Sequence, residues 1–215
     1  MTTFYIVRHA QSGGNAKIAS DHVIGKGSEL TEKGREQALK ISNKFKNITF
    51  DAIFSSDFTR ANQTAEIIAL EHKLAVQATE RLRERSLGIY FKKNPEKNRE
   101  IVEENLLKIF KGLNDQAKMD YKISDDVESA NEATSRFTTF LREIALEYNN
   151  KTILIVCHGN LIRTFLVHLG WTTYDELPKS SFKNTGYVTL ESDGVDFFIK
   201  KVYGATKNKV GKRGW

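Results

Sequence analysis

The sequence predicts an α/β fold: a three-layer α/β/α sandwich with a mostly parallel central sheet and a helical lid insertion. Apolar runs rich in β-branched residues at 4–9, 52–56 and 153–158 indicate strands buried on both faces, which is typical of a parallel sheet covered by helices. Amphipathic stretches with helical spacing alternate with these runs. No Pro/Gly/Ser-rich stretch divides the 215 residues, so we expect a single domain over residues 1–215.

The predicted elements have recognisable beginnings. Thr31 can accept a backbone N–H as the N-cap of a helix over about 32–46, and Ser129 with Glu132 forms a capping box. Phe58, Ala61, Ala65 and Ile68 follow helical spacing. In chain order we expect strand 4–9, loop 11–29, helix 32–46, strand 52–56, helix 57–71, strand 75–78, a lid, a helix after 129, strand 153–158, a helix directly behind it, and an edge hairpin of 187–191 and 195–202 turning at 192–194.

Two segments differ in composition from the rest. The lysine-rich segment at about 88–126, with an amphipathic core from Leu106 to Leu113, predicts the helical lid or insertion. Residues 200–215 form a predicted basic C-terminal tail without acidic residues. The remainder of the chain has equal numbers of basic and acidic residues, so the tail accounts for the net charge of +6. A solvated tail is favoured over one that attracts phosphates, nucleic acid or an anionic surface. The basic residues of the tail are Lys200, Lys201, Lys207, Lys209, Lys212 and Arg213.

Composition also limits the cellular setting. Cys157 is the one cysteine, so no intramolecular disulfide can form, and the apolar runs are too short to cross a membrane. The N-terminus begins directly with a strand rather than a signal peptide. We therefore expect a cytoplasmic protein without membrane contact.

The first predicted strand ends in a loop suited to phosphate. Arg8 supplies a rigid fork of N–H donors, and neutral His9 supplies a nitrogen nucleophile that can accept a phosphoryl group. Small residues follow up to Asn15, so that backbone N–H groups can approach an anion.

Two further strand ends carry matching chemistry. Arg60 lies in the first turn of the helix after strand 52–56, where a guanidinium can stabilise charge on a phosphoryl group in flight. His158-Gly159 marks a strand-to-helix junction, at which the helix N-terminus favours an anion and His158 can hold a phosphoryl oxygen. Because ligands bind where strands end, His9 and His158 are expected to share one site.

Glu84 is the candidate acid. Its carboxyl group can protonate a departing alkoxide and later deprotonate water, although among its arginine neighbours it could equally form a solvated ion pair. No group with metal-ligand spacing is apparent, so we expect neither a metal nor a cofactor, and His22, His72 and His168 are interpreted as surface or packing residues.

Two rival interpretations remain open. Cys157 and Arg163 have the spacing of cysteine-dependent phosphatases, but Leu161, Ile162 and Phe165 indicate a buried helix face where that chemistry needs an open loop. The other rival, a non-catalytic module that binds phospho-ligands or nucleic acid, would be marked by loss of the nucleophile or acid, and both are present.

Taken together, these motifs resemble the histidine phosphatase superfamily, which includes cofactor-dependent phosphoglycerate mutase, over nearly the whole chain from Phe4 to about Leu190. The resemblance implies His9 as the residue that becomes phosphohistidine, Glu84 as proton donor, and a phosphate pocket of Arg8, Ser12, Asn15, Arg60, His158 and Gly159. The matching residues are Arg8-His9 with Ser12 and Asn15, Leu30-Thr31 with Gly34 and Gln37-Ala38, Ser55-Ser56 with Arg60-Ala61 and Thr64-Ala65, Leu82 and Glu84 with Gly88, Glu128-Ser129 with Arg136, and His158-Gly159.

Departures from the family pattern bear on the activity. Mutases of the family carry a tyrosine where this chain has Leu87, and an adjacent arginine pair in the insertion, where this chain has scattered lysines. Hydrolysis of a small phosphorylated metabolite is therefore favoured. Mutase-type transfer stays open, because His158-Gly159-Asn160 resembles the mutase form of that motif. We allow for a homodimer and do not expect nucleic acid as a partner.

Overall fold

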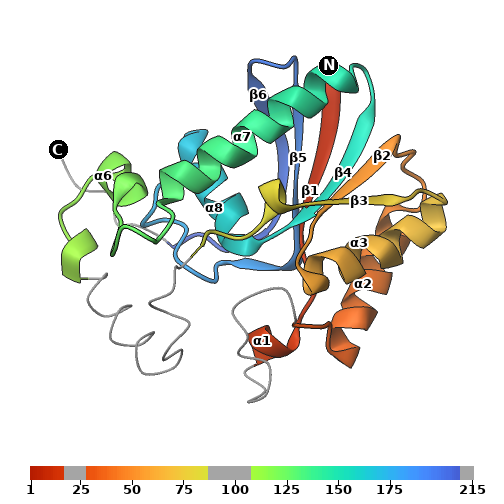
Figure 1. The fold of residues 1–215 in the computed structure, drawn as a ribbon, viewed down its shortest axis with the longest axis horizontal. Helices are drawn as coiled ribbons and strands as arrows, with labels where there is room; N and C mark the ends of the chain where they lie inside the picture. The colour runs from red at the N-terminus through yellow and green to blue at the C-terminus, as the bar shows by residue number, and fades with distance from the viewer. Residues whose placement is uncertain (17–27, 87–107, 209–215) are drawn as a thin grey trace.

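The computed structural model describes residues 1–16, 28–86 and 108–208. It contains one six-stranded sheet with helices on both faces (Figure 1). The elements in chain order are β1 (Thr2–Arg8), α1 (Gly13–Ala16), α2 (Glu32–Phe45), β2 (Ala52–Ser56), α3 (Thr59–His72), β3 (Val76–Thr79), the 3-10 turn η1 (Glu80–Leu82), α6 (Asp115–Asp120), α7 (Ala130–Glu147), β4 (Thr152–Cys157), α8 (Gly159–His168), β5 (Phe182–Ser192) and β6 (Phe197–Ala205).

The sheet has the strand order β3-β2-β4-β1-β5-β6. The first four strands in this order pair in parallel, whereas β5 runs antiparallel to both β1 and β6. The strands β2, β4 and β1 are adjacent and parallel, so their carboxyl ends lie side by side at the same end of the sheet. The predicted α/β class with a mostly parallel sheet is confirmed.

Two apolar clusters fill the space between the sheet and its helices. On one face, Phe137 and Leu141 of α7 and Phe165 of α8 pack against Phe4 and Ile155 of the sheet. The second cluster joins α2 and α3 to the opposite side chains of the same strands, which include Val7, Ile53, Leu154 and Val156. This division confirms the predicted three layers. It also explains why β1, β2 and β4 are apolar at successive positions.

The predicted helix caps are present. Thr31 accepts the backbone N–H of Gly34 at 3.0 Å, and Ser129 and Glu132 form both bonds of the capping box. Each cap satisfies a backbone donor that the first helical turn leaves without a partner.

Helix α3 begins later than the predicted residue 57. It starts at Thr59, and Phe58 is an extended residue in the N-cap position. The helical spacing that was assigned to Phe58 therefore does not place it on the buried face of α3. Its ring can instead contact residues at the end of the neighbouring strand.

The C-terminal hairpin is longer than predicted. β5 begins at Phe182 rather than at residue 187, and β6 continues to Ala205, with the turn at residues 193–196. Lys200 and Lys201 lie in β6, as the predicted strand over 195–202 has it, so the first part of the predicted basic tail over 200–215, up to Ala205, is strand rather than tail. Pairing along β5, with Lys201 opposite Thr189, holds them in the sheet.

Part of the predicted lid is described. Residues 108–110 are helical and α6 covers Asp115–Asp120, whereas residues 121–126 form an irregular stretch with bends and a turn. Residues 87–107, the loop at 17–27 and the chain end at 209–215 lie outside the described residues.

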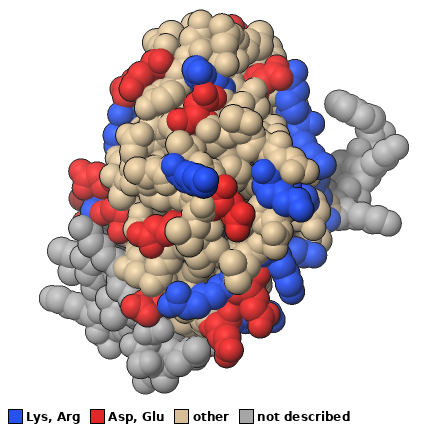
Figure 2. Space-filling view, turned by 90° about the vertical axis from the view of Figure 1, so that its right-hand side faces the viewer, with Lys and Arg blue, Asp and Glu red and all other residues tan. Residues whose placement is uncertain are grey.

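Charged side chains of both signs are scattered among uncharged residues on the face that carries the β3 edge and α3 (Figure 2). Acidic and basic groups are interspersed over most of this face, in agreement with the near balance of 33 basic and 27 acidic residues. In the three described stretches of the chain, no helix is both long and apolar enough to cross a membrane.

Candidate active site

The two histidines lie side by side at the carboxyl ends of neighbouring strands. Arg8 is opposite Cys157 in the β1–β4 register, and the backbone N–H of His9 donates to the Cys157 carbonyl at 2.9 Å. The ring centroids of His9 and His158 are 5.2 Å apart. The structure thus brings together two residues that are remote in sequence.

The tautomer of His9 follows from its hydrogen bonds. Its Nδ1–H donates to the carbonyl of Ala10 at 2.7 Å, which leaves the lone pair on Nε2. Arg60 Nε donates to this Nε2 at 3.2 Å. The ring is only 3% exposed, and burial, followed by the charges of Arg60 and Arg8, lowers its pKa well below the usual value. His9 is therefore a neutral imidazole with its basic nitrogen turned to a guanidinium.

His158 is held by the same arginine from another direction. Arg60 Nη2 donates to His158 Nδ1 at 3.3 Å, which puts the ring proton on Nε2, and this N–H donates to Ser56 Oγ at 2.9 Å. The Phe58 ring packs edge-on at 5.3 Å. Burial lowers the pKa of His158 well below its usual value, and Arg60 adds to the effect. In this arrangement the neutral His158 ring accepts a hydrogen bond from Arg60 and so orients its guanidinium group.

Arg60 therefore bridges both imidazoles. Burial is the main reason that its pKa falls to about 10, the charge of Arg8 lowers it further, and Glu84 acts in the opposite direction. A pKa of that size leaves the guanidinium charged at neutral pH. A permanent cation between two neutral rings suits a ligand that carries negative charge.

Arg8 depends on the absence of a side chain at Gly159. A Cβ at that position would lie 2.8 Å from Arg8 Nε and 2.9 Å from its Cδ. Arg8 Nη1 donates to the carbonyl of Phe182, whereas Nε is buried and has no partner in the stretches 1–16, 28–86 and 108–208. Burial lowers the pKa of Arg8, which Glu84 partly offsets. An unpartnered, buried N–H on a cation is a donor available to an anion.

Glu84 occupies the N-terminus of α8. Its two carboxylate oxygens accept the backbone N–H groups of Asn160 at 3.0 Å and of Leu161 at 2.9 Å. The sequence predicted that this helix end would favour an anion, and the group that occupies it is the side chain of Glu84. These donors are consequently engaged by the candidate acid itself.

The segment that carries Glu84 is fastened to the start of α7. Arg136 donates to both carboxylate oxygens of Glu128 at 3.0 and 3.1 Å and to the carbonyl of Arg83 at 3.3 Å. Glu128 also accepts the backbone N–H of Ser86 at 3.0 Å. Arg136 thus acts on the site through the backbone that holds Glu84.

The loop after β1 is closed by its own polar groups. Asn15 Oδ1 accepts from the backbone N–H of Ser12 at 3.3 Å and from its hydroxyl at 3.4 Å. Asn184 Nδ2 donates to the His9 carbonyl at 2.9 Å and to Asn15 Oδ1 at 3.3 Å. The structure therefore places Ser12 and Asn15 beside His9, in a network that shapes the loop.

Sequence reasoning missed two neighbours of the site, Phe58 and Asn184. Phe58 was assigned to the buried face of a helix, and its role depends on where α3 begins. Asn184 precedes the strand that was predicted to begin at residue 187, and its contact with His9 crosses from β5 to β1. The antiparallel pairing of β5 with β1 is the signal that could have suggested it.

The cysteine-based alternative is wrong. Cys157 is fully buried within β4, and burial strongly raises the pKa of its thiol. Arg163 is buried in α8, where it donates to the carbonyl of Tyr174 at 3.0 Å. A cysteine-dependent phosphatase needs a thiolate and an arginine that is free to bind phosphate. Here the thiol stays protonated and the arginine is bonded to a backbone carbonyl, so the two cannot form such a site.

The fold and the paired histidines define the class of this protein, and comparison with known proteins identifies the family. The sequence profile of the histidine phosphatase superfamily (branch 1) matches residues 4–203, so the chain belongs to that family of enzymes.

Among curated relatives, the chain is 31% identical over 167 residues to phosphoglycerate mutase-like protein 4 of Arabidopsis thaliana, a match that covers 74% of this chain and 67% of that protein. It is 35% identical over 95 residues to the probable phosphoglycerate mutase GpmB of Escherichia coli, which covers 44% of this chain and 43% of that protein. The chain thus matches less than half the length of the second relative.

Solved structures have the same fold. YhfR of Bacillus stearothermophilus matches with a TM-score of 0.76 and 26% identity, over 96% of this chain and 98% of that one. Phosphoserine phosphatase of Entamoeba histolytica matches with a TM-score of 0.68 and 23% identity over 94% and 97% of the two chains. Phosphoglycerate mutase of Bacillus anthracis matches with a TM-score of 0.71 and 22% identity over 94% and 92%.

Proposed function

We propose that this enzyme is a phosphomonoesterase that hydrolyses a small phosphorylated metabolite through a phosphohistidine on His9. The observation that carries the proposal is the fixed tautomer of His9. The Nδ1–H bond to Ala10 directs a neutral Nε2 lone pair toward Arg60, and the charge of Arg8 also acts on the His9 ring. A nucleophile and two cations around one point suit a phosphoryl group.

In the first step, His9 Nε2 attacks phosphorus and forms the P–N bond. The bond between phosphorus and the ester oxygen breaks, and its electron pair leaves with that oxygen, which takes a proton from Glu84. Arg8 and Arg60 stabilise the charge that spreads over the three remaining phosphoryl oxygens. Charge-assisted bonds of this kind gain strength where water is excluded, and both guanidinium groups are largely buried.

In the second step, water attacks the phosphohistidine. Glu84 accepts the proton of the attacking water, the P–N bond breaks, and its electron pair returns to His9 Nε2. Inorganic phosphate and the original neutral imidazole are the products. The lowered pKa of His9 favours this return, because a weakly basic imidazole is a better leaving group.

Mutase-type transfer is the second candidate. It is supported by the names of the relatives in Arabidopsis thaliana and Escherichia coli and by the residues His158-Gly159-Asn160. Hydrolysis is supported by Leu87 in place of a mutase tyrosine and by the missing arginine pair. In a mutase the phosphohistidine returns its phosphoryl group to the substrate, and water must be kept out.

The decisive experiment incubates the protein with a panel of phosphomonoesters that includes p-nitrophenyl phosphate, 3-phosphoglycerate, sugar phosphates and nucleotides. Released phosphate, isomerised phosphoglycerate and acid-labile protein-bound phosphate are measured together. We expect phosphate release with a phosphoenzyme that maps to His9 and is absent from His9→Ala.

Three outcomes oppose the proposal in different ways. Isomerisation of 3-phosphoglycerate without phosphate release establishes the mutase. A protein-bound label that is stable in acid, or that survives in His9→Ala, removes His9 as nucleophile. Ligand binding without turnover of any panel member favours a non-catalytic module.

A further inference from the structure

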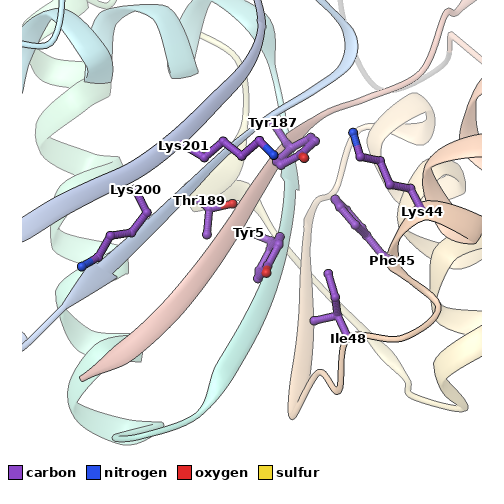
Figure 3. Close-up of a pocket in the computed structure, with 8 residues that line it drawn as sticks. All are labelled: Tyr5, Lys44, Phe45, Ile48, Tyr187, Thr189, Lys200 and Lys201. Carbon is purple, nitrogen blue, oxygen red and sulfur yellow. The ribbon is translucent and has the colours of Figure 1, made fainter.

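A second polar groove lies on the sheet, away from the two histidines. It has a volume of about 390 Å³ and lies between α2 and the strands β1, β5 and β6 (Figure 3). Its lining residues, which we call the lysine groove, are Tyr5, Lys44, Phe45, Ile48, Tyr187, Thr189, Lys200 and Lys201.

Three lysines line this groove, and its lining includes no carboxylate. Lys200 forms an ion pair with Glu191 at 2.9 Å. Lys44 instead lies over aromatic rings, with its Nζ 3.9 Å from the centroid of Tyr203 and 4.9 Å from that of Tyr187. Lys201 reaches toward Tyr187 from β6 (Figure 3), and no carboxylate pairs with it in the described part of the chain. Two of the three charges therefore lack an acidic partner.

The floor of the groove offers neutral donors beside these charges. The hydroxyls of Tyr5, Tyr187 and Thr189 have no hydrogen-bond partner among residues 1–16, 28–86 and 108–208. Thr189 lies directly opposite both Tyr5 and Lys201 in the sheet. Hydroxyl donors and unpaired ammonium groups converge here on one volume.

This combination favours a ligand with several negative charges. Like charges that are brought together repel one another unless a counterion lies between them. Phe45, Tyr5 and Tyr187 form an edge-to-face aromatic wall that fixes the positions of the surrounding side chains. A rigid, positively charged concavity of this size is suited to a small molecule rather than to a flat macromolecular surface.

We propose that the lysine groove binds a small, multiply charged oxyanion, in which phosphate or carboxylate groups contact Lys44, Lys201 and the hydroxyl of Thr189. This site is separate from the proposed catalytic centre and does not rest on the proposed function. Tyr5 precedes His9 by four residues on the same strand, which corresponds to about 13 Å along an extended chain.

The test is isothermal titration of the protein with pyrophosphate and, separately, with citrate. A His9→Ala/Arg60→Ala variant disables the histidine site, so that any remaining binding belongs elsewhere. In that background we expect binding of at least one of the two anions, weakened by added NaCl because the contacts are ionic. Binding of pyrophosphate alone identifies a phosphate site, and binding of citrate alone a carboxylate site.

Substitution at the groove supplies the matched comparison. Adding Lys44→Gln/Lys201→Gln is expected to raise the Kd by about tenfold or more, the effect of losing one to two charge-assisted bonds. Adding Lys33→Gln/Lys40→Gln, on exposed positions of α2 outside the lining, changes the charge equally and should leave the Kd unchanged.

Introduced alone into the wild-type chain, Lys44→Gln/Lys201→Gln should retain the wild-type turnover of p-nitrophenyl phosphate, because it leaves His9, Arg8 and Arg60 intact. The proposal fails if neither anion binds once His9 and Arg60 are replaced. It fails equally if the groove variant and the α2 control bind with the same Kd. Neither result bears on turnover at His9, so the two proposals stand or fall separately.

Discussion

Gly159 shows how a missing side chain shapes the site. Its Cα lies against the middle of the Arg8 side chain, and a methyl group there would overlap Nε and Cδ. These atoms cannot swing away freely, because Arg8 Nη1 is bonded to the Phe182 carbonyl. The backbone of Gly159 has an ordinary helical conformation, which any residue could adopt. The glycine therefore matters for the room that it leaves to the Arg8 side chain.

We predict that Gly159→Ala displaces Arg8 and lowers kcat/KM by about tenfold to a hundredfold, as expected for a misplaced donor to a developing charge. The fold should persist, because alanine is favourable in a helix. Steady-state kinetics and thermal unfolding measure the two effects.

A double-mutant cycle separates this mechanism from a general disturbance. In an Arg8→Ala background, Gly159→Ala should have little further effect on kcat/KM, because the crowded side chain is gone. Additive losses would show that Gly159 acts on something other than Arg8.

At the level of elements, the start of β5 holds two parts of the site at once. Phe182 accepts from Arg8, and Asn184 donates to the His9 carbonyl and to Asn15. The register of the hairpin shifts between Phe182 and Tyr187, and Thr185 has a φ of 56°. This irregularity turns the Asn184 amide toward β1, where a regular strand would direct its successive side chains to alternate faces.

We predict that Asn184→Asp reduces kcat by about tenfold or more, because a carboxylate oxygen replaces the donor and faces two acceptor oxygens. Asn184→Ala should be milder, since it removes the bonds without adding repulsion. The rate of phosphoenzyme formation measures the effect. Lys183→Gln, at the exposed neighbouring position, serves as the control. An unchanged rate in Asn184→Asp would contradict a positioning role for the amide.

Sequence reasoning succeeded where local pattern and topology agree. Apolar runs that end in His9 and His158 predict parallel strands, and parallel strands place such residues at one edge. Phe58 and Asn184 could not be predicted in the same way, because a helix start and a register shift decide where they point. Lys200 and Lys201 fall within both the predicted strand 195–202 and the predicted basic tail 200–215, and pairing with β5 places them in the strand.

At the scale of the whole molecule, two neutral imidazoles are buried beside two arginines. Burial and these charges lower the pKa values of His9 and His158. In the unfolded chain both histidines return to a pKa near 6.5. Below that pH the unfolded state binds more protons than the folded state, so the free energy of unfolding must decrease as the pH falls.

We predict that the free energy of unfolding is nearly constant from pH 8 to 7 and decreases from about pH 6.5 to 5. Each of the two histidines contributes up to about 1.4 kcal/mol per pH unit. Denaturant titrations across this range measure the slope. The range ends above the region in which carboxylates with lowered pKa values, such as Glu132 and Glu176, add their own loss.

The histidine variants provide the comparison. His9→Asn/His158→Asn should lose most of the slope and keep the smaller part that comes from His72, whose pKa is also lowered by burial. His168→Gln, at an exposed position, should retain the parental slope. A double variant that keeps the parental slope would place the proton uptake elsewhere.

The strand order has a consequence for how the site forms during synthesis. β4 lies between β2 and β1 and pairs with both, although it begins 96 residues after the end of β2 (152 − 56) and 144 residues after the end of β1 (152 − 8). A nascent chain that ends before β4 already carries Arg8, His9, Arg60 and Glu84. It lacks the strand that pairs with both β1 and β2. His9 comes to lie beside His158, with Arg60 bonded to both rings, only when the ribosome has released β4, so an incomplete chain lacks the arrangement on which the proposed chemistry depends.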